Sequence, residues 1–192
     1  MRLDEDITIA RLVDPGEVEP MLDSYVRWCL ERLATVNGVT FDDPEAVVAL
    51  YRGSFRTDLP HLCSARGRLL VARLHGRACG VGALKPIDAE TAEIKRLYVA
   101  PEHRRRGIAR RMLERLIDDA RAEGYRAIRL ETGNFMTDAH RLYRSLGFED
   151  IAAFDDRETA KSDGLEQYLY FMRLRLSDTP APRPIRRTPG PQ

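Results

Sequence analysis

Cysteine is scarce in this sequence, and the few cysteines show no pattern. The chain of 192 residues has three, Cys29, Cys63 and Cys79, an odd number at widely separated positions. This spacing favours neither a disulfide framework nor a zinc site, and each cysteine is expected to be a small buried apolar residue. The four histidines also lack metal-ligand spacing. The sequence therefore predicts no metal site and is typical of a reducing compartment.

Long apolar runs and an excess of charge of one sign are also missing. No stretch approaches the length of apolar chain that spans a bilayer, and the acidic start does not resemble a signal peptide. We therefore expect a cytoplasmic protein with no membrane partner. The 31 Lys and Arg residues against 30 Asp and Glu give a net charge of +1, which argues against a general nucleic-acid binder.

What the sequence does contain is a regular series of strand and helix patterns. The hydrophobic periodicity and the turn residues predict these elements: a strand at 6–13, helices at 16–34 and 42–53, a loop at 54–67, strands on either side of a turn at 75–76, a strand at 91–99, a helix at 107–123, a strand at 125–132, a helix at 137–146, and two final strands within 148–154 and 167–176. This order predicts one mixed α/β (α+β) domain over residues 1–176. The proline-rich remainder, 177–192, is expected to be disordered.

Five arginines crowd into the eight positions from Arg104 to Arg111, around a single Gly107. The cluster falls where a predicted strand ends and a helix begins. The first turn of a helix has N–H groups without intrahelical partners and a partial positive charge, so an anion such as a pyrophosphate can bind there. Gly107 and the small Ala109 allow close approach of a ligand, and the arginines add charge-assisted hydrogen bonds.

The spacing Arg104-x-x-Gly107-x-Ala109 within "LYVAPEHRRRGIARRML" resembles motif A of the GNAT N-acetyltransferase superfamily. Downstream, "AHRLYRSLGFED" resembles the closing helix of the same family. The resemblance is sharpest over residues 92–150 and does not cover the tail. It implies a mostly antiparallel central sheet of about six to seven strands flanked by about four helices, with acetyl-CoA as the cosubstrate.

The resemblance also implies a set of cofactor-binding residues. The strand Leu97–Val99 is expected to pair through its backbone with the pantetheine arm, and the N–H of Val99 to hold the oxyanion. Many family members have an Asn where this chain has Met136, and the nearby Asn134 is out of register. The cofactor-binding residues carried over are these: Leu97, Tyr98, Val99, Arg104, Arg105, Arg106, Gly107, Ile108, Ala109 and Arg110.

The family reaction is direct attack of an amine on the acetyl thioester, which needs a base and an acid but no nucleophile on the protein. Tyr143 occupies the position of the tyrosine that protonates the CoA sulfur in many members. Its other interpretation is a core residue on an apolar helix face. Glu93 resembles the strand glutamate that deprotonates the amine through water, with Glu131 as the second candidate. Its other interpretation is a strand carboxylate paired with Lys95.

Several alternatives stay open at this point. The chain can be an N-acetyltransferase or a non-catalytic protein that binds and senses acyl-CoA; a nucleic-acid module is disfavoured by the charge balance. The acceptor can be a small-molecule amine or a protein amine, and its site is expected within residues 15–67 and 148–168. A homodimer through the C-terminal strands is a further possibility that the resemblance implies.

Overall fold

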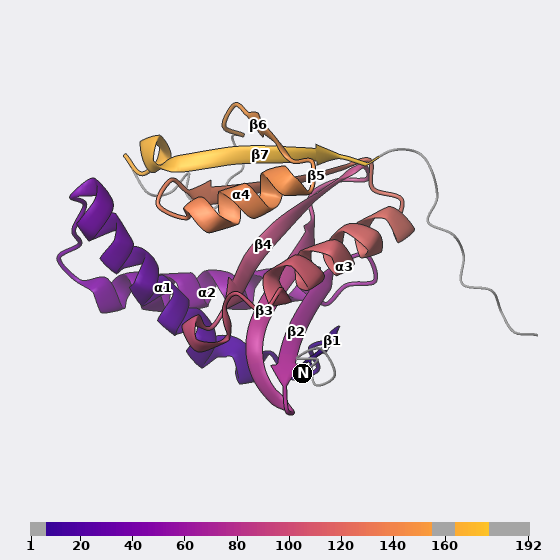
Figure 1. Cartoon of the computed structure of the whole chain (residues 1–192), viewed down its shortest axis with the longest axis horizontal. Helices are drawn as coiled ribbons and strands as arrows, with labels where there is room; N and C mark the ends of the chain where they lie inside the picture. Colours follow the sequence, from indigo (N-terminus) through magenta and orange to yellow (C-terminus); the bar gives the residue numbers. More distant parts are fainter. Residues whose placement is uncertain (1–6, 155–163, 177–192) are drawn as a thin grey trace, which may run out of the picture.

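The computed structural model describes residues 7–154 and 164–176, so the predicted disordered tail lies outside the described residues. One seven-stranded sheet forms the centre of the molecule, in the order β1-β2-β3-β4-β5-β7-β6 (Figure 1). All neighbouring strands are antiparallel except β4 and β5, which run parallel. The strands are β1 (Ile7–Arg11), β2 (Arg68–Leu74), β3 (Arg77–Pro86), β4 (Thr91–Val99), β5 (Ala127–Gly133), β6 (Glu149–Ile151) and β7 (Leu169–Arg175). This architecture confirms the predicted fold class.

In the described part of the chain, four α-helices cover the sheet: α1 (Glu19–Arg32), α2 (Pro44–Leu62), α3 (Ile108–Ala122) and α4 (Thr137–Ser145). Helices α3 and α4 share one apolar core with one face of the sheet, and α1 and α2 share a second core with the other face. The apolar face predicted for α3 is confirmed, because all six of its members are buried: Ile108, Met112, Leu113, Leu116, Ile117 and Ala120.

The prediction of a loop at 54–67 was wrong, because α2 continues through Gly53 to Leu62. Phe55 and Leu62, spaced by two helical turns, are fully buried against β2 and β3, and this packing outweighs the helix-weakening effect of Gly53. Pro60 falls in the last turn, where only one intrahelical hydrogen bond is lost.

Neither this helix nor any other in the described part of the chain is long and apolar enough to cross a membrane.

Strand β4 leaves its C-terminal backbone edge open on one side. Strand β4 pairs with β5 only over Thr91–Glu93, after which the two strands separate. On its other side, a shift in register with β3 places Arg96 in a bulge, with φ of 56°. Bulges of this kind bend a strand and re-aim its side chains. The backbone of Leu97–Val99 therefore has no strand partner on the β5 side within the described residues.

Candidate active site

A pocket of about 760 Å³ lies where β4 and β5 separate. One wall comes from α1, which rises along the side of the molecule toward the level of α4 (Figure 1). The opposite wall comes from α4 and the loop before it, and the end of β4 and the start of α3 complete the site. Its lining residues are Tyr25, Trp28, Arg32, Leu97, Tyr98, Val99, His103, Arg104, Arg105, Gly107, Ile108, Ala109, Arg110, Phe135, Met136, Thr137, Asp138, Ala139, Arg141, Leu142 and Tyr143. Nine of the ten predicted cofactor-binding residues and Tyr143 thus meet in one pocket.

The start of α3 is open to a ligand. Gly107 forms its N-cap with φ of 75°, a conformation that L side chains rarely adopt, and no side chain of the described residues caps the first turn. A Cβ added at Gly107 would meet no protein atom within 4 Å. The N–H groups of Ile108 and Ala109 therefore face a space in which an anion can take the place of a capping side chain.

The arginines of the cluster differ in their contacts with the rest of the protein. Arg104 donates from Nε to the carbonyl oxygen of Val99 at 3.1 Å and lies over the ring of Trp28, so it ties the loop to β4 and α1. Arg110 donates to the Ser145 hydroxyl at 2.7 Å, joining α3 to α4. Arg105 lines the pocket in a left-handed conformation, with φ of 60°.

Arg106 is the predicted cofactor-binding residue that the structure leaves outside the pocket lining. It is exposed, directly before the helix cap. Its contribution to cofactor binding stays a prediction.

Tyr143 is 5% exposed and lines the pocket from α4. Burial raises the pKa of its phenol well above the ordinary value, so the hydroxyl stays protonated at neutral pH. Its ring packs against Phe148 at 5.7 Å between centroids. Among the described residues, no group accepts a hydrogen bond from this hydroxyl. Tyr143 therefore has both a core ring and a hydroxyl that is available to a ligand.

Glu93 lies at the last pair between β4 and β5, opposite Arg129, and not in the lining of the pocket. It is 2% exposed, and both of its carboxylate oxygens are held by cations. Oε1 is 3.2 Å from Lys95 Nζ and Oε2 is 3.0 Å from Arg129 Nε. The pairing with Lys95 that the sequence suggested is present. Glu131 lies on β5, two residues after Arg129. It is opposite Phe171 of β7 and is also outside the lining of the pocket.

A second group of charges lies on the same side of β4, against α2. Asp58 of α2 contacts Lys85 at 2.6 Å and Arg96 at 3.3 Å. The Arg96 guanidinium also lies over the rings of Tyr51 and Phe55. These contacts fix the bulge of β4, because the inserted residue is held by both a charge and two aromatic faces.

The α1 wall is the part of the site that the sequence did not reveal. Tyr25, Trp28 and Arg32 recur at spacings of three and four along α1 and line the pocket, and Tyr25 also packs against the core cluster that contains Leu22. Trp28 meets the ring of Phe135 from the loop before α4 at 6.0 Å, and Tyr25 meets that of Tyr98 at 5.1 Å. The helical spacing of Tyr25, Trp28 and Arg32 was the only local signal, and none of the three was predicted for the site by residue, because their neighbours come from distant parts of the chain.

Cys29 lies on α1 beside this wall. Burial raises its pKa to about 12, and the hydrogen bond with Tyr25 and the charge of Arg104 oppose that rise only in part. The neutral thiol therefore persists at physiological pH, and Cys29 has no nucleophilic character there.

The loop between β5 and α4 contains Met136, at the position where the family resemblance implied an Asn. Met136 lines the pocket, and its sulfur accepts a weak hydrogen bond from Thr132 Oγ1 at 3.5 Å. Asn134 is tied by its backbone N–H to the carbonyl of Tyr168 at 2.7 Å and is not part of the lining. The departure at Met136 therefore places a thioether, and not an amide, in contact with the ligand space.

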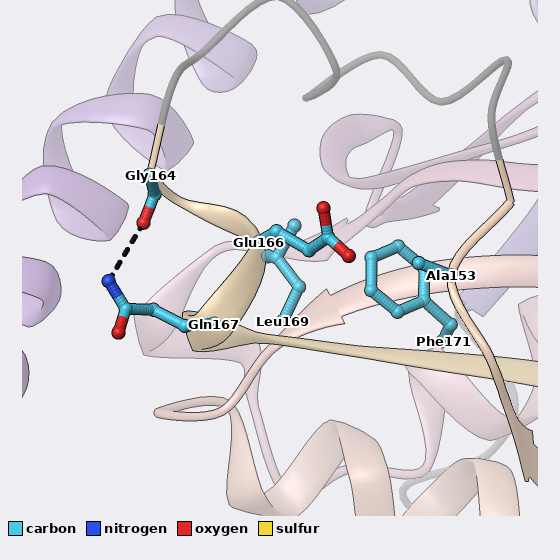
Figure 2. Close-up of a pocket in the computed structure, with 6 residues that line it drawn as sticks. All are labelled: Ala153, Gly164, Glu166, Gln167, Leu169 and Phe171. Atoms are coloured by element: carbon cyan, nitrogen blue, oxygen red, sulfur yellow. Dashed lines mark hydrogen bonds between the residues drawn. The ribbon is translucent and has the colours of Figure 1, made fainter.

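A separate hollow of about 560 Å³ lies at the β6–β7 end of the sheet and shares no lining residue with the first. Figure 2 shows its six residues, with the Glu166 carboxylate beside the Phe171 ring and Gln167 donating to the carbonyl of Gly164 at 3.1 Å. Its other members are Ala153 and Leu169. It falls in the region where the sequence placed part of the acceptor site.

The parallel strand pair that separates beside a glycine-capped helix is the arrangement that the motif resemblance to acetyltransferases implied. The chain belongs to the acetyltransferase (GNAT) family, whose family model matches residues 26–148. It is 44% identical over 99 residues to an IAA acetyltransferase of Azospirillum brasilense, a match that covers 50% of this chain and 64% of that protein. The matches to the first curated relatives thus span less than two thirds of their length.

Solved structures agree with this assignment at the level of the fold. A PaiA N-acetyltransferase of Thermoplasma acidophilum in complex with coenzyme A has a TM-score of 0.67 and 19% identity, covering 90% of this chain and all of that one. A GNAT family acetyltransferase of Elizabethkingia anophelis with acetyl-CoA bound has a TM-score of 0.59 and 20% identity, with 90% and 100% covered. The predicted family and fold are therefore confirmed.

Proposed function

We propose that this protein is an N-acetyltransferase that moves the acetyl group of acetyl-CoA to a primary amine in a ternary complex. The observation that carries the proposal is the pocket itself, which combines an uncapped helix start, an open strand edge and a protonated tyrosine. Solved relatives of the same fold contain acetyl-CoA or coenzyme A. No metal enters the proposal.

In this proposal the first turn of α3 and the arginines at 105 and 110 bind the pyrophosphate. The pantetheine arm pairs with the free edge of Leu97–Val99, as a short additional strand would. This places the thioester near the end of β4, within the pocket that Tyr143 lines. The N–H of Val99 is the proposed donor to the oxyanion.

The chemistry balances with groups of this chain. The amine nitrogen attacks the thioester carbon, a C–N bond forms, and the C–S bond breaks without a covalent enzyme intermediate. Tyr143 donates its proton to the departing sulfur, and the second proton lost by the attacking nitrogen as the amide forms returns the tyrosinate to the phenol through water. Glu93 accepts the proton of the ammonium through water, because its carboxylate lies at the point where β4 and β5 separate and not in the pocket wall.

The test is CoA release from acetyl-CoA across a panel of amino acids, polyamines, aminoglycosides and short peptides with free N-termini. Wild type, Glu93→Gln and Tyr143→Phe are compared. Turnover that falls in both variants supports the proposal. If no amine in the panel causes CoA release but acetyl-CoA still raises the melting temperature, the protein is better described as a non-catalytic sensor of acyl-CoA. If acetyl-CoA does not raise the melting temperature either, the cofactor assignment is wrong as well.

A further inference from the structure

Arg32 is a cation of the pocket to which neither the family motif nor the proposed mechanism gives a role. It lies in the last turn of α1, one turn beyond Trp28, and is half-buried in the wall that faces α4. Going along that wall, Tyr25 is next to the end of β4, Trp28 is next to the loop before α4, and Arg32 follows at the end of α1. The wall therefore presents two aromatic rings followed by a guanidinium.

The neighbouring arginines of α1 and α2 show what is different about Arg32. Each of them is held by a carboxylate in a two-pronged contact: Arg27 by Glu45, Arg52 by Asp23 and Arg56 by Glu19. Arg32 has no such contact with any acidic residue in 7–154 or 164–176. A cation that is partly removed from water without a counter-charge is costly, so an anionic group of a ligand is the natural partner.

The other arginines of the pocket already have protein partners or lie at the cofactor loop. Arg104 is bound to Val99, Arg110 to Ser145 and Arg141 to Asp138. Arg105 belongs to the loop before α3, where the phosphates are proposed to bind. Arg32 comes from a different element, on the side of the pocket that the cofactor loop does not form. An anion at Arg32 is therefore better assigned to the acceptor than to the cofactor.

We propose that Arg32 binds a carboxylate of the acceptor, and that the acceptor is an α-amino acid with an apolar, preferably aromatic, side chain. This inference rests on the proposed transferase function and names its substrate class. The planar guanidinium matches a carboxylate in a bidentate contact. Tyr25 and Trp28 supply the flat apolar surface for the side chain.

The test compares amine pairs that differ only in the carboxylate: phenylalanine with phenethylamine, and tryptophan with tryptamine. The quantity measured is the ratio of kcat/KM within each pair. Wild type is expected to favour the amino acid, and Arg32→Gln to lower that ratio by about ten- to hundredfold. Arg27→Gln is the matched control, because Arg27 lies on the same helix, outside the pocket and paired with Glu45. It is expected to keep the wild-type ratio.

The same ratio is read from dissociation constants measured by calorimetry with CoA present, so the test does not depend on turnover. Binding that follows the carboxylate and Arg32, without turnover, would support the inference and count against the proposed transferase. A ratio that Arg32→Gln leaves unchanged would overturn the inference, as would failure of both members of each pair to bind. A rise in the acetyl-CoA KM without a change in the ratio would assign Arg32 to a cofactor phosphate and also overturn it.

Discussion

The Nε of Arg104 donates to the carbonyl oxygen of Val99 across 3.1 Å, while its guanidinium lies 4.9 Å from the centre of the Trp28 ring. One side chain thus connects the cofactor loop, the end of β4 and helix α1. The Val99 carbonyl belongs to the strand edge that is proposed to hold the pantetheine arm. The role of Arg104 is therefore to position the loop, in addition to any charge that it offers to a phosphate.

We expect Arg104→Gln to raise the KM for acetyl-CoA by roughly tenfold, because both the hydrogen bond to Val99 and the stacking on Trp28 are lost. Arg104→Lys should recover little of this, since an ammonium cannot reproduce the planar contact. Steady-state kinetics gives the answer. Arg115→Gln, on the exposed side of α3 and paired with Asp119, controls for charge. Full recovery by the lysine variant would show that charge alone matters.

Gly107→Ala should weaken acetyl-CoA binding beyond its effect on stability. The left-handed φ of 75° costs an alanine about 1 kcal/mol, and the added Cβ occupies the space in front of the first turn of α3. Gly124→Ala is a matched control, because Gly124 has φ of 80° and an equally open surrounding at the other end of α3. Both variants should lose similar stability in denaturant unfolding. Only Gly107→Ala should raise the dissociation constant of acetyl-CoA. Equal dissociation constants for the two variants would contradict phosphate binding at the first turn of α3.

Tyr143→Phe should lower kcat by about ten- to a hundredfold and leave the KM for acetyl-CoA nearly unchanged, since the ring keeps its packing and only the proton donor is lost. Burial raises the pKa of Tyr143, so the donor stays protonated into the alkaline range. Ionisation of Tyr143 should therefore not lower the wild-type kcat as the pH rises to the ordinary tyrosine pKa. A variant with an unaltered kcat would assign Tyr143 to the core alone.

Cys29 should make the stability of the fold depend on pH in the alkaline range. Its pKa rises from an ordinary value of 9.0 to about 12 on folding. The stabilisation is therefore complete below pH 9 and is lost as the pH rises toward 12, by up to about 1.4 kcal/mol per pH unit. Denaturant unfolding at a series of pH values should show a shallower loss for Cys29→Ala than for wild type. Cys63 is exposed, so the expectation that each cysteine is buried was wrong for it, and Cys63→Ala should keep the wild-type slope. Equal slopes for all three proteins would contradict the raised pKa of Cys29.

The cofactor side of the site was predictable from the sequence because its geometry is local. Gly107 and the helix that follows it lie within one short stretch, and the periodicity of α3 identifies its buried face. The α1 wall was not predictable in this way. Trp28 and Phe135 are more than 100 residues apart in the chain and meet only through the packing of α1 against the sheet. The extension of α2 to Leu62 was also not predictable from local sequence, because it depends on the burial of Phe55 and Leu62 in the folded protein.

The position of Glu93 illustrates a further limit of sequence reasoning. The sequence places Glu93 on the strand that became β4, and the contact with Lys95, which was the alternative to a catalytic role, is present in the structure. The second partner, Arg129, comes from β5 and depends on the register of the parallel pair. The consequence is a carboxylate held between two cations at the start of the strand separation, so its proposed action on the amine must pass through water.

The most direct test of the account is to follow an isotopically labelled acetyl group from acetyl-CoA in the presence of the amine panel. Mass spectrometry would be applied to both the amines and the protein. The account predicts the label in the amide of one acceptor class, at a rate that falls in Tyr143→Phe and Glu93→Gln. Label that stays in acetyl-CoA, or leaves only as free acetate, would contradict transfer to an amine.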